Sequence, residues 1–337
     1  MSVVYIISDH GKLNHVNETL EFTANDGTIR KMFPHRMECL IVRGVVSISG
    51  KAFRLLIKHQ INTIFISSNG KFNGKLVFNE TKNIFLRKKQ YSLSDIENSA
   101  LLIAKSIVSA KVKNELTFIQ RIKRKGGNGQ EFLEIVQDFK KIIEQIETVE
   151  NVEKLRGYEG IAARKYFSVF RYNIIPDWAE FPRRSKNPPL TNVNAVLSFL
   201  YTLLMYRIET AIEAAGLDTM AGFLHEHEYG KSALVFDLSE EFRTPVVDTL
   251  CCSLFNLGVL SLEDFNVITE DEERPVLLTK DGLKKVIIAF QKKMDTLVHY
   301  PPAESQLSWQ MIIIEQVRHL KRVILGEEMI YKGFLYK

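Results

Sequence analysis

The amino-acid sequence predicts an α+β protein, with a small β-rich N-terminal domain followed by a larger, mostly α-helical C-terminal domain. Three observations predict this class. The first eighty residues contain short β-branched and aromatic runs separated by Asn, Asp, Gly and Ser, as is typical of strands joined by turns. From about residue 92, apolar residues recur at helical spacing. The length of 337 residues favours two domains over one.

The N-terminal part reads as strands with one helix between them. The helix is expected at 50–60, where Ala52, Leu55, Leu56 and His59 recur at helical spacing. Strands are expected at 2–7, 19–23, 39–42, 62–66 and 75–78. We therefore predict a β-rich domain over 1–80, an interdomain linker over 81–93 and the helical domain over 94–337.

The C-terminal part reads as a series of amphipathic helices. They are expected at 95–124, 130–148, 157–172, 191–215, 240–257, 280–298 and 306–325. The segment KRKGGNG at 123–129 has the composition of a loop, and SALVF at 232–236 reads as a buried strand. The chain is expected to end in a loose basic tail, GFLYK, that is either disordered or docked on a partner.

Composition narrows the function only slightly. The net charge of +5 and the pI near 8.9 permit nucleic-acid binding without establishing it. Cys39, Cys251 and Cys252 form neither a disulfide framework nor a CxxC zinc motif, which fits a reducing cytoplasm. The start of the chain lacks the features of a signal peptide, and the apolar stretch 195–206 is too short to span a bilayer. A soluble, cytoplasmic protein without a membrane partner is expected.

Four residues suit a site for a hard divalent cation that acts on phosphate. They are Glu159 in RGYEGIAARKYF, His225 in GFLHEHE, and Asp237 and Glu240 in FDLSEEFR. Carboxylates and one imidazole are ligands that such cations accept. The four come together only if the fold joins the two segments.

Ordinary structural roles compete with this interpretation. A glutamate in the first turn of a helix, as Glu159 would be, commonly interacts with the helix dipole. Asp237 and Glu240 could likewise mark a helix start. His225 could be a hydrogen-bonded packing residue, and His227 and Glu228 could equally be the active members of HEHE.

Two basic groups are candidates for contact with a nucleic-acid backbone. The first is Lys111, Lys113, Arg121, Lys123, Arg124 and Lys125, a pattern that is also typical of a solvated helix face. The second includes Arg164, Lys165, Arg183, Arg184 and Lys186, interspersed with aromatic residues. It is the better candidate because it adjoins Glu159 in the sequence. P-loop, GxSxG, Rossmann and HExxH motifs are absent from the sequence.

An ordered set of segments resembles the family of CRISPR-associated spacer-acquisition integrases, also called CRISPR-associated protein one. The segments are GYEGIAA with Tyr166-Phe167, RRSKNPPLTNVN before AVLSFLYTLL, GFLH, and DLSEEFR with Val247-Asp248. The resemblance covers essentially the whole chain. It departs from the family pattern in two places: the third ligand position is Glu240 rather than Asp, and Thr244 precedes Pro245.

The resemblance implies a site and a reaction. Glu159, His225 and Glu240 would bind Mg²⁺ or Mn²⁺, and Asp237 would be an assisting catalytic acid. The implied reaction is transesterification, in which the 3′-hydroxyl of a captured DNA fragment attacks a phosphodiester of the repeat DNA. We expect Arg164, Lys165, Arg183, Arg184 and Arg243 to bind the DNA backbone.

The resemblance also implies partners. These are double-stranded and branched DNA, a second copy of the chain that pairs through the β-domain, and CRISPR-associated protein two, which joins two such dimers in a heterohexamer. Two other functions remain open: a general metal-dependent phosphodiesterase acting on branched DNA, and a DNA-binding scaffold without metal. An α-helical interaction protein with no DNA affinity is a third.

Overall fold

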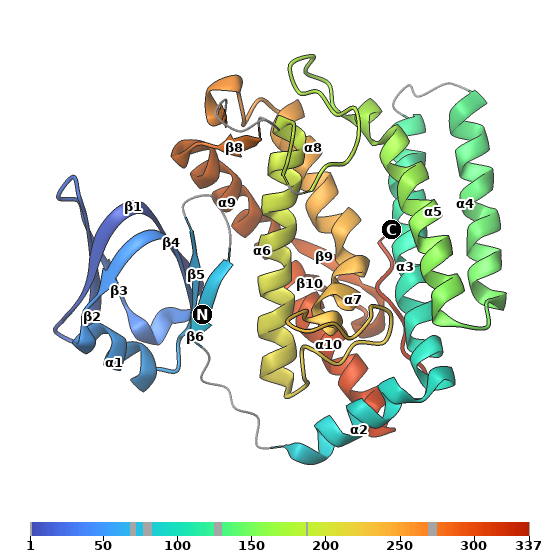
Figure 1. Cartoon of the computed structure of the whole chain (residues 1–337), viewed down its shortest axis with the longest axis horizontal. Helices are drawn as coiled ribbons and strands as arrows, with labels where there is room; N and C mark the ends of the chain where they lie inside the picture. Colours follow the sequence, from blue (N-terminus) through green and yellow to red (C-terminus); the bar gives the residue numbers. More distant parts are fainter. Residues whose placement is uncertain are drawn as a thin grey trace. The chain divides into compact units, whose positions relative to one another are not determined.

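The computed structural model describes residues 2–67, 72–76, 83–124, 130–186, 188–268 and 275–336. The chain divides into two compact units, Met1–Glu80 and Thr81–Lys337, each of which is described by itself. The first is a mixed β-sheet with a helix and the second is mostly helical, which confirms the predicted fold class (Figure 1).

The N-terminal unit is built on a six-stranded sheet with the order β3-β2-β1-β4-β5-β6. Strand β4 is parallel to both β1 and β5, and the other neighbours are antiparallel. The elements are β1 (Ser2–Val16), β2 (Thr19–Ala24), β3 (Ile29–Met32), η1 (Pro34–Arg36), β4 (Met37–Ile48), α1 (Gly50–Lys58), β5 (Asn62–Ile66) and β6 (Phe72–Leu76).

Helix α1 lies where the apolar spacing places it. Ser49 caps its N-terminus by accepting a hydrogen bond from the backbone N–H of Ala52. Ala52, Leu55 and Leu56 are buried in the core of the sheet, whereas the helix ends before His59, which is exposed. Each expected strand has a counterpart, but β3 was not anticipated, because its IRKM sequence has mostly exposed side chains and little apolar signal.

An irregularity joins the two long strands of this sheet. The register between β1 and β4 shifts between Ile7 and His10. Opposite the shift, Gly44 has a φ of 101° and approaches so closely that an added Cβ would lie 1.8 Å from the carbonyl oxygen of Ser8. Glycine is therefore required at this crossing of the two backbones.

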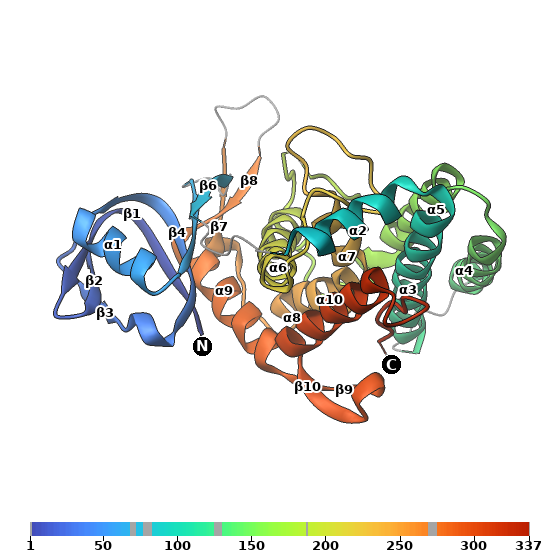
Figure 2. The ribbon, with the colours of Figure 1, turned by 90° about the horizontal axis from the view of Figure 1, so that it is seen from below.

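Most of the second unit consists of helices. In both ribbon views α3, α4 and α5 pack together, and contacts between each pair of these helices agree (Figures 1 and 2). The helices are α2 (Ile84–Asp95), α3 (Glu97–Arg124), α4 (Gln130–Thr148), α5 (Val152–Phe170), η2 (Arg171–Asn173), α6 (Asn192–Ala215), α7 (Ala233–Phe242), η3 (Arg243–Asp248), α8 (Thr249–Asn256), η4 (Leu262–Asp264), α9 (Lys280–Asp295), η5 (Pro301–Ala303) and α10 (Trp309–Leu325). Two short hairpins are made by β7 (Phe265–Val267) with β8 (Val276–Leu278) and by β9 (Leu297–Tyr300) with β10 (Ser305–Ser308).

Helix α6 contains the stretch 195–206 that was expected to be too short for a membrane span. As a 24-residue helix, α6 is long and apolar enough to cross one by length and composition alone. Its apolar side chains, however, are largely buried within this unit, and it packs against α7, α8, α9 and α10. It is therefore a core helix of this unit.

Two expectations for this unit differ from the structure, and a third falls outside the described residues. The expected strand at 232–236 is the N-cap residue Ser232 and the first turn of α7, because a short, fully buried apolar run fits either element. Much of the segment expected as a linker is α2, which packs on α3 and α10. The glycine-rich part of the 123–129 loop lies outside the described residues.

The C-terminal tail is docked on its own unit rather than loose. Tyr331 and Phe334 are 2% and 4% exposed, which buries two large aromatic side chains after the end of α10. The backbone N–H of Gly333 donates to the Ser106 hydroxyl of α3, and that of Tyr336 donates to the side chain of Asn114. The tail therefore belongs to the core of this unit.

Candidate metal centre

Glu159 from α5 and Glu240 from α7 share one ammonium group. Lys111 of α3 forms an ion pair with Oε1 of Glu159, and its Nζ lies 2.6 Å from Oε2 of Glu240. The Lys111 and Glu240 side chains are only 5% and 3% exposed, whereas Glu159 is 26% exposed. The fold thus joins the two sequence segments, which are about eighty residues apart.

The positions of these acids within their helices exclude the helix-start interpretation. Helix α5 begins at Val152, where Asn151 caps it, so Glu159 lies in the helix interior and not in the first turn. Helix α7 begins at Ala233, so Asp237 and Glu240 are also interior residues. Their spacing of three places both on one side of α7, as a helix requires.

Buried charges determine the protonation of this cluster. Burial opposes the charge of Glu240, but Arg243 and Lys111 outweigh it and lower the pKa of the carboxyl to about 2. Burial likewise opposes the charge of Lys111, but Glu240, Glu159 and Glu115 raise the pKa of the amine above its usual value. Glu240 and Lys111 are therefore both charged at neutral pH.

Arg243 fixes Glu240 from the other side. Its guanidinium donates across 3.0 Å to Oε1 of Glu240 and lies over the ring of Tyr201, 5.3 Å from the ring centroid. Arg243 begins a π-helical turn that ends at Asp248, in which the backbone N–H of Thr249 bonds to the carbonyl of Thr244. Pro245 has no N–H to donate within this turn, which favours the wider spacing.

His225 is held by Asp237, which is fully buried. Nδ1 of His225 lies 2.7 Å from Oδ1 of Asp237, and the same carboxylate accepts the backbone N–H groups of Phe223, Leu224 and His225. Since both carboxylate oxygens are engaged, Asp237 positions the histidine rather than binding a metal itself. Nε2 is the ring nitrogen that this arrangement leaves for a ligand role.

The loop before His225 can approach α7 only because it carries a glycine. A Cβ added at Gly222 would lie 2.7 Å from Oδ2 of Asp237 and 2.8 Å from the Cβ of Ala233. The other members of HEHE point to different partners. His227 pairs through Nε2 with the carbonyl of Gly222, and Glu228 forms an ion pair with Lys231. Of the two histidines, His225 is thus the one paired with a carboxylate of α7.

The sequence interpretation did not assign two buried charged side chains near the centre to the site. Lys111 was assigned to a solvated or DNA-binding basic segment, yet it is 4% exposed. Glu115, one turn further along α3, is 2% exposed and has one carboxyl oxygen, Oε2, without a hydrogen-bond partner. Both interrupt a row of buried residues that includes Ala104, Ile107 and Phe118. A lysine and a glutamate on the apolar face of a helix were the available signal.

Burial strongly affects Glu115. It raises the pKa of the Glu115 carboxyl to about 8, and the neighbouring charge of Lys111 only partly opposes the increase. At neutral pH this carboxyl therefore carries a proton, unlike Glu240.

A second buried carboxylate supports the centre through two tyrosines. Asp248, at the end of the π-helical turn, accepts hydrogen bonds from Tyr166 at 2.8 Å and Tyr201 at 2.5 Å. Burial raises the pKa of Asp248, and the two hydroxyls oppose the increase. These contacts tie α5 and α6 to the π-helical turn.

The neighbour of Glu240 secures the C-terminal tail. Glu241 is fully buried and accepts hydrogen bonds from the Tyr331 hydroxyl, the Gln316 amide and the backbone N–H of Phe334. Asn114 of α3 donates to the carbonyls of both Glu241 and Phe334. Adjacent glutamates of α7 thus serve different purposes, Glu240 in the centre and Glu241 in the fold.

The residues expected to bind DNA are placed unequally. Arg164 and Arg183 are exposed, and Lys165 forms an ion pair with Asp138. Arg184 is engaged in the fold, since its guanidinium donates to Asn194 and Ser198. Arg243 is paired with Glu240, as described above.

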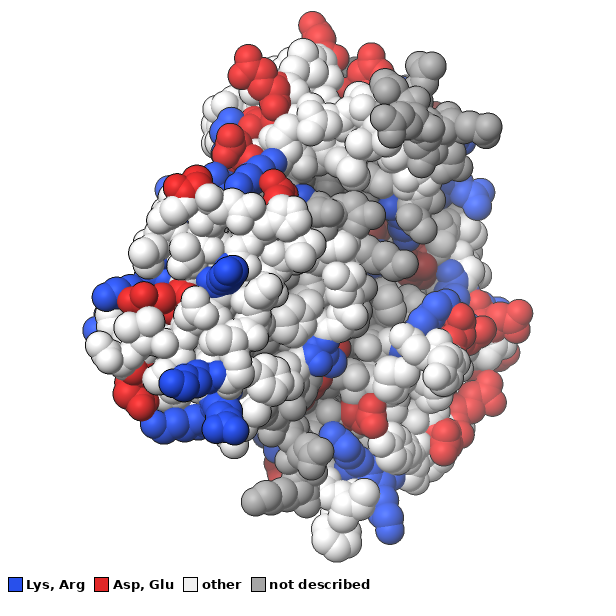
Figure 3. Space-filling view, turned by 60° about the vertical axis from the view of Figure 1, so that its left-hand side comes forward, with Lys and Arg blue, Asp and Glu red and all other residues white. Residues whose placement is uncertain are grey.

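Charge on the surface is mixed. On the face shown in Figure 3, lysine and arginine side chains form small groups interspersed with aspartate and glutamate.

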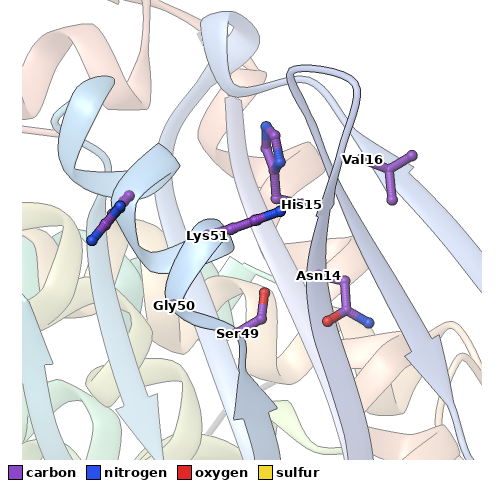
Figure 4. Close-up of a pocket in the computed structure, with 7 residues that line it drawn as sticks. Asn14, His15, Val16, Ser49, Gly50 and Lys51 are labelled. Carbon is purple, nitrogen blue, oxygen red and sulfur yellow. The ribbon is translucent and has the colours of Figure 1, made fainter.

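The N-terminal unit has an open pocket of about 690 Å³ between the start of α1 and the end of β1 (Figure 4). Its lining residues are Asn14, His15, Val16, Ser49, Gly50, Lys51 and Arg54.

The donor set at the centre fits a divalent cation. Two carboxylates and an imidazole are ligands that Mn²⁺ and Mg²⁺ accept, and Oε2 of Glu240 is a buried oxygen that already faces a cation, the ammonium of Lys111. Within the described residues, no group of three or more His, Cys, Asp or Glu side chains is close enough to hold a metal as it stands. Between Glu159 and Glu240, the ammonium of Lys111 takes the place of such a cation.

The sequence and the fold were compared with those of known proteins. The family model described as CRISPR associated protein Cas1 matches residues 4–292. A CRISPR-associated endonuclease Cas1 from Leptospira interrogans is 34% identical over 75% of this chain and 100% of its own length. A CRISPR-associated endonuclease Cas1 from Thermus thermophilus is 29% identical over 99% of this chain and 97% of its own length.

Solved structures share the fold. A Cas1 protein from Thermotoga maritima superposes with a TM-score of 0.83 at 24% identity and covers 99% of this chain and 100% of its own. A casposase bound to integration product has a TM-score of 0.84 at 23% identity over 100% of this chain and 95% of its own. A chain of a Cas6-RT-Cas1–Cas2 complex has a TM-score of 0.85 at 20% identity and covers 100% of this chain and 36% of its own. Together with the family match over most of the sequence, these findings show that the chain belongs to the Cas1 family of CRISPR-associated proteins.

Proposed function

We propose that this protein is a metal-dependent DNA endonuclease and integrase that inserts captured foreign DNA fragments as new spacers into a CRISPR array. The observation that carries the proposal is the pair of Glu159 and the buried Glu240, from separate helices, on the same unit as an oriented His225. The endonuclease names of the relatives and the casposase described as bound to integration product support it. The work would take place in the cytoplasm, where the array is located.

The cation would be held by Glu159, His225 and Glu240. When bound, Mg²⁺ or Mn²⁺ supplies a Lewis acid that polarises a phosphodiester. The protein's own residues prepare the site for it. Asp237 holds the imidazole by Nδ1, and Arg243 holds one oxygen of Glu240, so that the ligand groups do not have to be ordered on binding.

The proposed reaction exchanges one phosphodiester for another. The 3′-oxygen of the captured fragment forms a bond to phosphorus as the bond to the 3′-oxygen of the repeat strand breaks. The attacking hydroxyl loses its proton and the leaving oxygen gains one. Since one ester replaces another, the step requires no nucleotide hydrolysis, which is consistent with a sequence that lacks a P-loop.

DNA contacts are proposed for the basic residues nearest the centre. Arg164 and Arg183 are exposed and can meet a phosphate directly. Lys186 is another candidate, because its side chain is exposed at the surface. Lys165 would have to break its ion pair with Asp138 before it could bind a phosphate. The guanidinium of Arg184 donates to Asn194, so Arg184 would act by holding the neighbouring backbone in place.

The assembly is proposed as a homodimer joined by a companion protein. The free edges of the N-terminal sheet are β3 and β6, and an exposed edge strand is a ready surface for self-association. One structural relative is a chain of a Cas6-RT-Cas1–Cas2 complex, which supports a companion of that kind. Light scattering on the full chain, alone and with its companion, tests both partners. A chain that stays monomeric at all concentrations would exclude the homodimer.

Strand transfer and cleavage on branched DNA, with Mg²⁺, Mn²⁺ or chelator, test the proposed activity. We expect metal-dependent activity that falls by at least about a hundredfold in Glu159→Gln, His225→Ala and Glu240→Gln, because each removes a ligand. Matched controls are His227→Ala and Glu228→Ala, which lie in the same loop but have partners away from the centre. Both controls should retain activity.

The outcomes separate the proposal from its alternatives. Cleavage without strand transfer would favour a general phosphodiesterase acting on branched DNA. DNA binding without Mn²⁺ binding or activity would favour a non-catalytic scaffold. If ligand variants and controls behaved alike, the Glu159–Glu240 pair would be structural.

A further inference from the structure

Lys111 occupies a position that a divalent cation would need. Its Nζ lies 2.6 Å from Oε2 of Glu240 and pairs at the same time with Oε1 of Glu159. A cation held by both carboxylates would coordinate these oxygens at roughly 2.0–2.2 Å. The ammonium and the metal therefore compete for one location between α5 and α7.

A second carboxyl lies within reach of the same lysine. Glu115 follows Lys111 by four residues on α3, a spacing at which helical side chains are neighbours. It is 2% exposed, and its Oε2 lacks a hydrogen-bond partner. No ion pair joins it to Lys111 in this structure, in which the lysine is turned toward the two glutamates of the centre.

A buried carboxyl oxygen without a partner is costly, and so is a buried ammonium without one. A lysine expelled by a metal would need a new counter-charge, since its side chain is 5% exposed and cannot easily reach water. Glu115, on the same helix, supplies that charge when its carboxyl releases its proton to solvent. Helix α3 packs against both α5 and α7, so the exchange needs side-chain rotation and no movement of helices (Figure 1).

We propose that Lys111 is a tethered cation that holds Glu159 and Glu240 together in the metal-free protein and passes to Glu115 when a divalent cation binds. The inference rests on the proposed metal site and adds two positioning residues to it. It explains why a third acid, Glu115, lies beside the centre although it is not one of the proposed metal ligands. Metal affinity is then set by an internal exchange of partners, in addition to the ligands themselves.

Direct Mn²⁺ binding to the full chain, followed by electron paramagnetic resonance without DNA, tests the exchange. Lys111→Met should bind Mn²⁺ about tenfold more tightly than wild type, because no internal cation has to be displaced. Glu115→Gln should bind about tenfold more weakly, because the displaced ammonium loses its second partner. Lys186→Met is the matched control, since it removes a nearby positive charge that has no ion pair with either glutamate.

The double variant gives the sharper test. In Lys111→Met the Glu115→Gln change should alter Mn²⁺ affinity by less than about twofold, because the side chain that Glu115 receives is gone. A structure of the Mn²⁺-loaded protein should show Nζ away from Glu159 and Glu240 and next to Glu115. If Lys111→Met does not fold, Glu115→Gln and the loaded structure still decide the matter.

Failure of this inference differs from failure of the proposed function. Equal tightening by Lys111→Met and Lys186→Met would mean that only net charge matters, which overturns the exchange while leaving the metal site intact. Additive effects in the double variant, or Nζ still bridging both glutamates beside bound Mn²⁺, would also overturn it. Absence of Mn²⁺ binding in every protein, wild type included, would overturn the exchange and the metal site together.

Discussion

Individual side chains in this protein divide the work of one site among different chemical roles. Glu159 and Glu240 both pair with the ammonium group of Lys111. Asp237 instead accepts hydrogen bonds from three backbone N–H groups and pairs with Nδ1 of His225. A carboxylate thus serves as a candidate ligand in one place and as a fixed support in another. The hydrogen-bond partners of each carboxylate separate the two roles.

Asp237→Asn tests the supporting role. The amide keeps one acceptor but points an NH₂ group at N–H donors, so we expect a loss of about 3 kcal/mol in unfolding free energy, measured by urea denaturation. Asp281→Asn is the control, because that side chain is 79% exposed and pairs with Lys284 at the surface. The control should change stability by less than about 0.5 kcal/mol. Equal effects in the two variants would argue against a positioning role for Asp237.

Glu115 makes a prediction about pH. The pKa of its carboxyl in the folded protein, about 8, is above the ordinary glutamate value of 4.5. Between these two pH values the folded protein therefore holds a proton that the unfolded chain has released. Stability therefore falls as pH rises through this window, by at most about 1.4 kcal/mol per pH unit, and levels off above it. In chelator, wild type should lose stability relative to Glu115→Gln between pH 5 and pH 8 (roughly the titration window of this carboxyl).

The control for this prediction is Glu144→Gln, which changes an exposed acid on α4. Its stability should follow that of wild type across the same pH range. A constant difference between wild type and Glu115→Gln at all pH values would show that this carboxyl titrates normally.

At the level of elements, α7 connects the centre to the C-terminal tail. Glu240 faces Lys111, and the next residue, Glu241, secures residues 331–334. The tail in turn contacts α3 through Ser106 and Asn114. The end of the chain therefore braces the two helices that carry Lys111 and Glu240.

Phe334→Ala tests this bracing. Phe334 is 4% exposed and packs edge-on against Trp309, with 5.3 Å between the ring centroids, so its truncation should cost about 3–5 kcal/mol in a denaturation experiment. Leu335→Ala is the matched control, since that neighbour is 45% exposed and should cost less than about 1 kcal/mol. Similar costs for both would mean that the tail is not part of the core.

For the whole molecule, the mild positive charge has to be considered by location. Several arginines are committed to internal contacts, such as Arg184 to Asn194 and Arg207 to Gln291. The basic side chains left at the surface are interspersed with acids (Figure 3). Net charge therefore overstates the surface that is free to bind DNA.

The salt dependence of DNA binding tests which arginines contribute. Arg164→Gln and Arg183→Gln should each reduce the slope of log K against log salt on duplex DNA by about 0.9, the value for one phosphate contact. Arg318→Gln is the control, because its guanidinium pairs with Glu315 on α10. An unchanged slope in both test variants would remove these residues from the proposed DNA surface.

Local sequence patterns were enough to predict the fold class and most helix and strand positions. An ordered set of motifs predicted the family and the residues proposed as ligands. Those features depend on local periodicity and on motifs that are continuous in the chain. The apolar run 232–236 was misjudged because helix and strand bury such a run equally well. The role of Asp237 could not be derived, since its partners lie twelve or more residues away in a loop that has no regular pattern.

The pairing of the buried charged side chains became visible only in the three-dimensional structure. That structure placed Lys111 between Glu159 and Glu240, left Oε2 of Glu115 without a partner and docked the tail on Glu241. Each depends on contacts between helices far apart in the sequence, where burial makes an unpaired charge costly and so determines which partners meet. A linear pattern records which residues are charged, whereas packing determines which of them share a partner.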